Sequence, residues 1–596
     1  MTAGKKRIWG AATALALVLV LPVVAQESLL PEGFGDPAPP PAERPTPAPT
    51  PAPGPAPVPS APITGTPALL PDSTATADVD DEAEEGAENG ILRYDLPPGA
   101  RRSLDRIGPL TPETGGMDST AFGVRGQYAA RIMAATRAPI ASRWASITLR
   151  RALASAIDTP RTIHGADLAA ARAALLVRMG EAQAARLVVQ SVDADRGTPR
   201  LAQAALQTML ANADPAGLCP WANLGLERTS DVASWRLASG MCSALSSEPG
   251  PAGSAIERVR NSGRLTNFDI LLAERVLGAT LSGRRSITIQ WDGVDRLTSW
   301  RFGLATATGI AIPAALRTAA PPAMQAWAAL APMTPVDERV AAARTAARIG
   351  VLSGDAYVAL VAAAAGEDAG EDSNALADTV RAAFAAADAA DRFAAMRGLW
   401  QAADNPDDRY AAMVLTSRAA AALPPGTDAG DDLGLLLGSM LAGGYEDNAR
   451  AWLPAVNEGS HAWGVMAVGL PRAINGIDAG AVGNFASDDD SAGNVRAKFL
   501  VAGLAGLGRL TGAELSTAAG DLDISLGKQT RWTRAIDDAA ARGEPGMVAL
   551  LVAAGMQSRD WTELPPYHLY RMVRALREVG LASEARMLAA EALVRV

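Results

Sequence analysis

The sequence predicts an all-α fold: an α-solenoid of stacked antiparallel helix pairs, preceded by a disordered proline-rich leader. From residue 121 onward, apolar residues recur at steps of three and four in segments of roughly 12 to 18 residues, which is the period of amphipathic helices. Short breaks of Gly, Pro or Asp separate these segments. A glycine followed five residues later by Ala-Arg also occurs three times along the chain.

The N-terminus has the three parts of a secretory signal. Basic residues 5–7 precede an apolar run over residues 8–24, and Ala25 ends a small-residue cleavage site. We expect residues 1–25 to be a signal peptide that is cleaved after Ala25. Alternatively, the apolar run remains as an anchor, since its length is at the short end of what spans a bilayer. Both interpretations predict an exported protein of the periplasm or cell envelope.

Two segments that cannot form a core follow the signal. Of the 41 residues from position 31 to 71, 16 are proline, which fixes φ and favours extended polyproline II. We expect residues 26–71 to be a disordered linker that acts as a spacer. Residues 72–90 form an acidic segment whose like charges repel and keep it solvated. An irregular lead-in over residues 91–120 then precedes the helical repeat domain, residues 121–596.

Individual helices can be placed from their patterns. In residues 567–579, the apolar positions 569, 572, 573, 576 and 579 fall on one helical face. Thr334 is expected to cap a helix that has Pro335 in its first turn, and Gly350 is expected to end that helix. Residues 286–291, SITIQW, are the one segment that suggests a strand.

The recurring Gly-to-Ala spacing has a physical explanation in αα-hairpins. Glycine permits a tight turn with positive φ between two antiparallel helices. The alanine five residues later lies where the second helix must approach the first closely. Because a single hairpin leaves an apolar face exposed, hairpins stack until a continuous core forms. We expect these roles for Gly180 and Ala185, Gly444 and Ala449, and Gly580 and Ala585.

This spacing resembles the second half of tetratricopeptide-type (TPR) repeats, in which a small residue also recurs seven positions after the alanine. Gly580, Ala585 and Ala592 match all three positions, whereas Val192 and Val456 take the last position in the other two hairpins. The first-helix signature of the family is not found upstream of Gly580, and the 34-residue period is irregular. The chain is therefore similar to divergent TPR-like α-solenoids over about three hairpins. The resemblance implies a scaffold that binds peptides or proteins in its concave face.

Cys219 and Cys242 are the only cysteines of the chain. In an exported protein such an even pair predicts a disulfide. Closing a loop of about 24 residues would stabilise the fold by roughly 3 kcal/mol in the chain-entropy model. Two buried thiols are the alternative. Neither cysteine has a neighbouring ligand that would suggest a metal site.

Composition and motifs argue against several classes of function. The net charge is −10, and residues 1–90 alone carry −8 of it, so the rest of the chain is nearly neutral and nucleic acid is not an expected partner. His164, His461 and His568 stand singly, without the spacing of zinc ligands. No nucleophile-elbow, Walker A or dinucleotide motif occurs.

Two short matches do not complete a site. Residues 525–528 satisfy SxxK but lack the partner motifs of serine acyltransferases. Residues 488–493 begin like an EF-hand, but Phe499 stands where a bidentate Glu is needed, so a polar turn that caps the next helix is the better interpretation. We therefore expect no catalytic, cofactor or metal site.

The sequence favours an exported, non-enzymatic scaffold that binds a protein or peptide partner. The alternative is a peptidoglycan- or polysaccharide-associated protein related to the helical domains of lytic transglycosylases. It rests on twelve tryptophans that could stack on sugar rings, and on a faint similarity of residues 26–28 and 555–557 to motifs of those enzymes. Tryptophans buried in the core would favour the scaffold instead. Membrane contact is expected only if the signal segment is retained.

Overall fold

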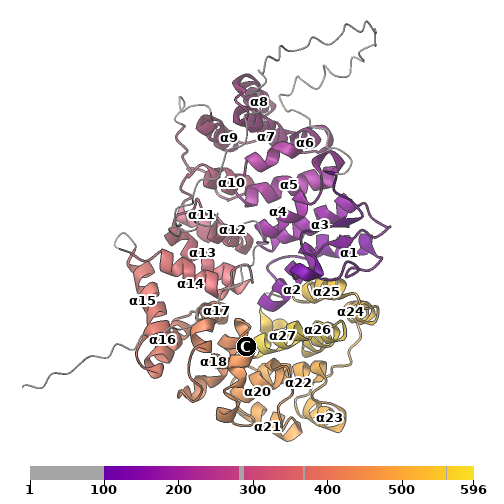
Figure 1. Cartoon of the computed structure of the whole chain (residues 1–596), viewed down its shortest axis with the longest axis vertical. Coiled ribbons are helices and arrows are strands. Elements are labelled where there is room, and N and C mark those ends of the chain that lie inside the picture. The colour runs from indigo at the N-terminus through magenta and orange to yellow at the C-terminus, as the bar shows by residue number, and fades with distance from the viewer. Residues whose placement is uncertain (1–99, 281–286, 367–369, 559) are drawn as a thin grey trace, which may run out of the picture. The chain divides into compact units, whose positions relative to one another are not determined.

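The computed structural model describes residues 100–280, 287–366, 370–558 and 560–596 (Figure 1). In this part the chain forms 27 α-helices, and two short strands, β1 (Arg106–Ile107) and β2 (Ile157–Asp158), pair antiparallel. The fold is all-α, as predicted. The signal peptide, linker and acidic segment predicted for residues 1–90 lie outside the described residues.

The helices follow one another with short connections. The first fourteen are α1 (Gly126–Ala135), α2 (Arg143–Ala154), α3 (Gly165–Arg178), α4 (Ala182–Gln190), α5 (Pro199–Ala211), α6 (Ala222–Arg228), α7 (Val232–Leu245), α8 (Pro249–Ser262), α9 (Asn267–Thr280), α10 (Ser299–Ala307), α11 (Ala314–Thr318), α12 (Pro322–Leu330), α13 (Val336–Arg348) and α14 (Gly354–Ala363). The others are α15 (Glu371–Ala385), α16 (Ala389–Gln401), α17 (Pro406–Ala421), α18 (Leu433–Ala442), α19 (Glu446–Arg450), α20 (His461–Gly469), α21 (Ala479–Ser487), α22 (Val495–Leu507), α23 (Gly512–Asp521), α24 (Arg531–Ala541), α25 (Pro545–Gly555), α26 (Pro566–Glu578) and α27 (Ala582–Val594). None of these helices is both long enough and apolar enough to cross a bilayer.

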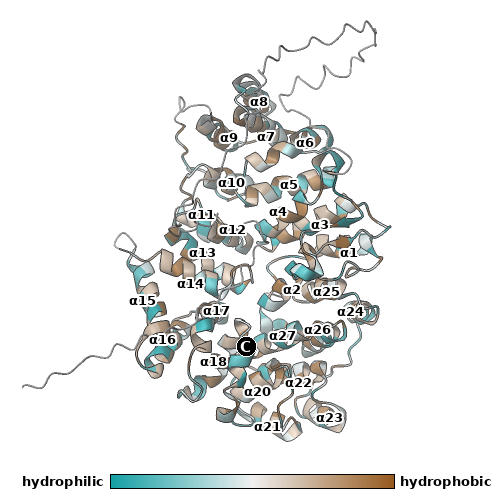
Figure 2. Cartoon of the chain, in the orientation of Figure 1, coloured by the Kyte–Doolittle hydropathy of each residue, from teal (hydrophilic) through white to brown (hydrophobic). Residues whose placement is uncertain are grey.

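Consecutive helices pack as pairs, and the pairs stack. Helix α3 packs on α4, α12 on α13, α17 on α18 and α26 on α27, while contacts such as α3 with α5 and α22 with α26 join one pair to the next. One apolar cluster extends through helices from α1 to α27. Figure 2 shows hydrophilic residues scattered over every part of the array. Stacking therefore buries the apolar face that each pair would leave exposed by itself.

The three glycines of the recurring spacing occupy the turns between paired helices. Their φ angles are +90° at Gly180, +83° at Gly444 and +84° at Gly580, a region that favours glycine. The alanines five residues later, Ala185, Ala449 and Ala585, are fully buried. At Gly180 an added Cβ would also lie 2.9 Å from the Ala326 side chain of α12. This turn is thus a packing contact between two pairs as well as a reversal of the chain.

Two local expectations differ from the structure. Helix α13 has Pro335 rather than Thr334 at its N-cap, and no side chain caps it. Residues 287–291 are irregular and not a strand, because they have no neighbouring strand with which to pair. Trp291 is fixed instead by side-chain contacts: its indole N–H donates to the Ala311 carbonyl at 3.0 Å, and its ring packs on Phe268 at 4.9 Å.

The described part of the lead-in belongs to the folded body. Arg172 of α3 is fully buried and donates to the carbonyl oxygens of Leu153 and Ile107, each at 2.7 Å, and to that of Ser155. Burial without a carboxylate lowers the pKa of Arg172 to about 9. Because Ile107 lies in β1, this one side chain ties the lead-in to α2 and α3. From residue 100 onward, the lead-in therefore packs on the helices that follow residue 121.

Cys219 and Cys242 form a disulfide, as the sequence predicts, with Cα atoms 5.5 Å apart. Cys219 belongs to the 3-10 helix Ala216–Trp221 and Cys242 to α7. The bond thus ties the irregular segment after α5 to the next long helix. Such a crosslink stabilises mainly by restricting the unfolded chain.

The first helices of the array pack against the last. Helices α1 and α2 contact α25, and α2 also contacts α27. At this contact the Glu591 carboxylate of α27 accepts hydrogen bonds from the Ser142 hydroxyl at 2.6 Å and from the backbone N–H groups of Arg143 at 2.8 Å and Trp144 at 3.1 Å. An acidic side chain at a helix N-terminus satisfies unpaired N–H groups and complements the helix dipole. Helix α2 is therefore capped by a residue 449 positions away in sequence.

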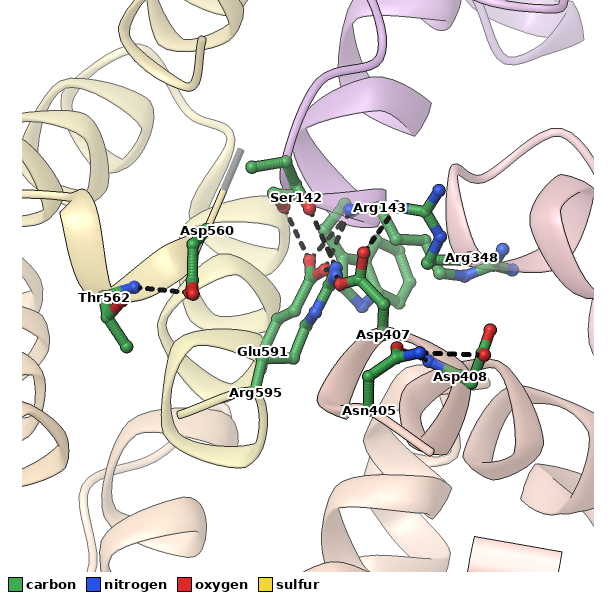
Figure 3. Close-up of polar contacts among 12 residues, drawn as sticks. Ser142, Arg143, Arg348, Asn405, Asp407, Asp408, Asp560, Thr562, Glu591 and Arg595 are labelled. Atoms are coloured by element: carbon green, nitrogen blue, oxygen red, sulfur yellow. Dashed lines mark hydrogen bonds and ion pairs between the residues drawn. The ribbon is translucent and has the colours of Figure 1, made fainter. Parts of the chain in front are cut away.

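Arg595 extends this contact to the middle of the chain (Figure 3). Its guanidinium donates to Glu591 at 2.9 Å and to the Ala141 carbonyl at 2.8 Å, and it pairs with Asp407 at the start of α17. Asp407 also accepts from Arg348 of α13 at 2.9 Å. Glu591 is 2 % exposed and Arg595 3 %. We call Glu591, Arg595, Asp407 and Arg348 the closing cluster, because it joins α2, α13, α17 and α27.

Replacing Glu591 tests the closing cluster. We expect Glu591→Ala to cost about 3 kcal/mol or more in stability, because it leaves the Arg595 cation buried beside α2 without a key partner. The unfolding midpoint in urea should fall, and amide hydrogen exchange at Arg143 and Trp144 should accelerate. Glu578→Ala is the matched control, since Glu578 forms an exposed pair with Arg574 at the same spacing and should contribute under about 0.5 kcal/mol. Equal effects of the two variants would contradict the proposed role of the cluster.

Candidate functional site

A groove of about 1090 Å³ lies between α1, α3 and α5 on one side and α12 on the other. The three helices on the first side are neighbours, because α1 packs on α3 and α3 on α5 (Figure 1). Helix α12 is held opposite them where Ala326 packs against the turn at Gly180.

Each of the three helices presents the same spacing to the groove. The lining positions are 127, 130, 131 and 134 on α1, then 167, 170, 171, 174, 177 and 178 on α3, and 200, 203, 204 and 207 on α5. Steps of three and four place these residues on one face of a helix. The groove is therefore made mainly by three aligned helical faces, to which the loop residues Ala138, Thr162 and Ile163 add.

Small side chains explain why the groove is open. Alanine occupies the middle of every stripe, for example Ala130, Ala171 and Ala204. An alanine surface is apolar but adds little volume, so room remains between these helices and α12. The opposite wall includes Met324 and Trp327, and Trp327 is 4 % exposed with its ring packed on Phe302 at 5.6 Å. The indole is thus part of the core beneath the groove and does not project into it.

Polar and charged groups stand at the ends of the stripes. Arg200 pairs with Asp167 at 3.1 Å, and the Thr198 hydroxyl donates to the same carboxylate at 2.7 Å. Arg178 donates to the Met133 carbonyl at 2.6 Å. Burial lowers the pKa of Arg178, because its charge is partly removed from water without a carboxylate beside it.

Arg131 is exposed on α1, and no carboxylate of the described residues pairs with it. Of the three arginines that line the groove, only Arg200 has an acidic partner there. The groove therefore carries a net positive charge. Together with the alanine floor, this charge is complementary to a chain segment that combines small side chains with carboxylates.

The histidines do not form a shared site. His164 lines the groove beside α3, and His461 begins α20. His568 of α26 packs on Trp532 of α24, with the ring centroids 4.3 Å apart. Among the residues that the structure describes, no group of three or more metal-ligating side chains converges. Lys528 of the SxxK segment lies over the Tyr567 ring at 5.2 Å.

Residues 488–493 form the polar turn that the sequence favoured over a calcium loop. Asp489 accepts from the backbone N–H of Ala497 at 2.9 Å, and the Ser491 hydroxyl accepts from that of Arg496 at 3.0 Å. Both contacts satisfy N–H groups in the first turn of α22. Helix capping thus explains the role of Asp489 in this turn.

The tryptophans belong mainly to the core. Three of those in the described part are half-buried, and the others are buried. The buried ones are Trp221, Trp235, Trp300, Trp327, Trp400, Trp452, Trp463 and Trp561. Stacking on a sugar requires an exposed ring face, so these residues give no support to a glycan site.

No family model matches the chain, and neither the curated proteins nor the solved structures searched include a match.

The groove was not identified from the sequence, although a signal for it is present. Residues 127–134 and 200–207 each place alanine together with Gln or Arg at steps of three and four. In an alanine-rich chain this pattern is common in helix interfaces as well. Only the packing shows that α12 stays far enough from α1, α3 and α5 to leave these faces uncovered.

His461 generates a prediction about acid stability. Its Nε2 lies 3.1 Å from the Leu593 carbonyl of α27 and donates to it. Burial, followed by the nearby Arg496 cation, lowers the pKa of His461 from 6.5 to about 4. The unfolded chain thus binds a proton at a higher pH than the folded chain, so stability is complete above pH 6.5 and is lost as pH falls toward 4.

We expect His461→Gln, which can still donate to Leu593, to lessen this loss. Melting temperatures measured from pH 7 to pH 4.5 should fall less steeply in the variant than in the unmodified chain. The exposed His164→Gln variant controls for the loss of a histidine. Parallel pH profiles for His461→Gln and the unmodified chain would contradict the assignment.

Proposed function

We propose that this chain is an exported, non-enzymatic helical-repeat scaffold, which binds a protein partner in the periplasm or cell envelope through the groove. One observation carries the proposal: three aligned helical faces, each of which combines alanine with polar side chains, stand open opposite α12. Helical faces left uncovered in this way offer a surface on which a segment of another chain can pack.

The polar groups of the groove fit a peptide. The side-chain amides of Gln127, Gln203 and Gln207 line it, and each can both donate and accept hydrogen bonds. A peptide backbone needs both kinds of partner when it leaves water. The volume of about 1090 Å³ is at the upper end for small-molecule sites, which favours a chain segment of several residues.

Export is supported by the N-terminal pattern and by the disulfide. Residues 1–25 have the composition of a signal peptide, and Cys219 and Cys242 are bonded to each other. Disulfides persist in oxidising compartments such as the periplasm. The similarity of three hairpins to TPR-type repeats is consistent with partner binding, while the buried tryptophans remove the main argument for the polysaccharide-binding alternative.

A photo-crosslinking amino acid placed in the groove tests the proposal. At position 134, an exposed alanine of α1, the probe should attach to one partner segment that peptide mass spectrometry identifies. At the exposed Ala513 of α23, outside the groove, the same segment should be absent. Ala130→Trp should reduce the crosslinked yield about tenfold by filling the groove, which corresponds to about 1.4 kcal/mol of binding energy.

The matched substitution Ala513→Trp should leave the yield unchanged. Equal capture at both positions, or capture at neither, would overturn the proposal. Sedimentation with peptidoglycan, if abolished by Ala130→Trp and not by Ala513→Trp, would replace it with the polysaccharide-binding alternative.

A further inference from the structure

We infer that the groove is a binding site for acidic peptide, and that its occupant in the free chain is the chain's own acidic run, residues 80–89. The inference rests on the proposed function, because it assigns an occupant to the same groove. It depends on three observations: the unpaired positive charge of the groove, the concentration of carboxylates in one segment, and the position at which the described chain begins.

Charge complementarity is the first step. Residues 80–89 read DDEAEEGAEN and contain six carboxylates and no cation. The groove presents Arg131 and Arg178 without acidic partners, while Asp167 is already engaged by Thr198 and Arg200. Ala83, Gly86 and Ala87 also give the run small side chains, which suit a floor of alanines. Residues 80–89 thus combine the charge and the size that the groove favours.

The second step is where the described chain starts. The backbone N–H of Arg102 donates to Asp193 at 2.8 Å, and Arg196 donates to the Arg102 carbonyl at 2.7 Å. Asp193 and Arg196 precede α5 by only a few positions, and Arg200 of α5 lies at the end of the groove. The Leu104 carbonyl accepts from Thr159 at 2.5 Å and lies against Gly165, the first residue of α3. The chain therefore enters the fold beside the end of the groove that holds His164 and Asp167.

The length of the connection is the third step. Eleven residue steps separate Asn89 from Ala100, and an extended chain covers about 36 Å over that number. Helix α3, with 14 residues, gives the groove side a length of about 20 Å. The connection is thus long enough for residues 80–89 to reach any part of the groove. Tethering at such a length supplies an effective concentration in the millimolar range, so weak charge contacts are enough for docking.

Spin labels on the full chain test the docking. Because both native cysteines are in the disulfide, labels attach only to introduced thiols. In 50 mM salt the pair Ala83→Cys and Ala134→Cys should give a short, narrow distance distribution by pulsed electron resonance. The control pair Ala83→Cys and Ala513→Cys should give a broad one, because Ala513 lies outside the groove.

Two charge variants and one control test whether charge complementarity causes the short distance. Amide replacement of the six carboxylates (D80N, D81N, E82Q, E84Q, E85Q and E88Q) should abolish the short distance, and so should Arg131→Glu. Arg531→Glu makes the same charge change at an exposed position of α24 and should preserve it. Raising the salt to 0.5 M should broaden the distribution, because exposed charges are then screened within a few ångströms.

A short distance that survives neutralisation of the six carboxylates would overturn the inference. A short distance that vanishes when labelled chain is diluted with unlabelled chain would assign the acidic run to a second copy and overturn docking within one chain.

Crosslinking of a partner at position 134 reports on the proposed function separately. If the acidic run docks, the neutralised variant should capture several-fold more of that partner. Docking without any partner capture would refute the proposed function and leave the inference intact.

Discussion

The capping of α2 by Glu591 is the contact on which the rest of the arrangement depends. A buried carboxylate is costly unless its hydrogen bonds are satisfied, and here four donors surround it: the Ser142 hydroxyl, two backbone N–H groups and Arg595. Since the carboxylate lies on the last helix and three of the donors lie at the start of the second, the cap forms only when the two ends of the helical array meet. Arg595 and Asp407 then connect this contact to α13 and α17. Stacked hairpins otherwise contact only their neighbours, so the closing cluster adds the long-range contacts that an open array lacks.

The groove follows from how the first hairpins are held. Helix α3 is fixed by Arg172 to the lead-in and to α2, and the turn after α3 packs on α12 at Gly180. Helix α1 is fixed between α3 and α25. These contacts leave one face of each of α1, α3 and α5 lining the groove opposite α12. The surface available for binding is therefore a consequence of where the helices are anchored, and small side chains keep it open.

The charged groups divide into two sets with different physical roles. In the closing cluster Glu591 and Arg595 are buried, and all four groups are linked by ion pairs that specify the packing of four helices. Those of the groove are partly exposed, and two of its arginines have no acidic partner among the described residues. A cation that is left unpaired on a surface contributes little to folding and is available to a ligand. This difference separates the structural use of arginine in the closing cluster from the binding use that we propose for the groove.

The sequence by itself determined the helical class, the hairpin turns and the disulfide. Each of these depends on local rules: the 3.6-residue period, the positive φ that glycine allows at Gly180, Gly444 and Gly580, and the pairing of the only two cysteines of the sequence. The strand expected at 286–291 failed over its described residues because a strand needs a partner, and local propensity cannot supply one. The closing cluster and the groove were decided by tertiary structure alone. Glu591 and Ser142 are 449 positions apart, and no pattern along the chain signals that one caps the other. Likewise, an alanine stripe has the same sequence whether a neighbouring helix covers it or leaves it open.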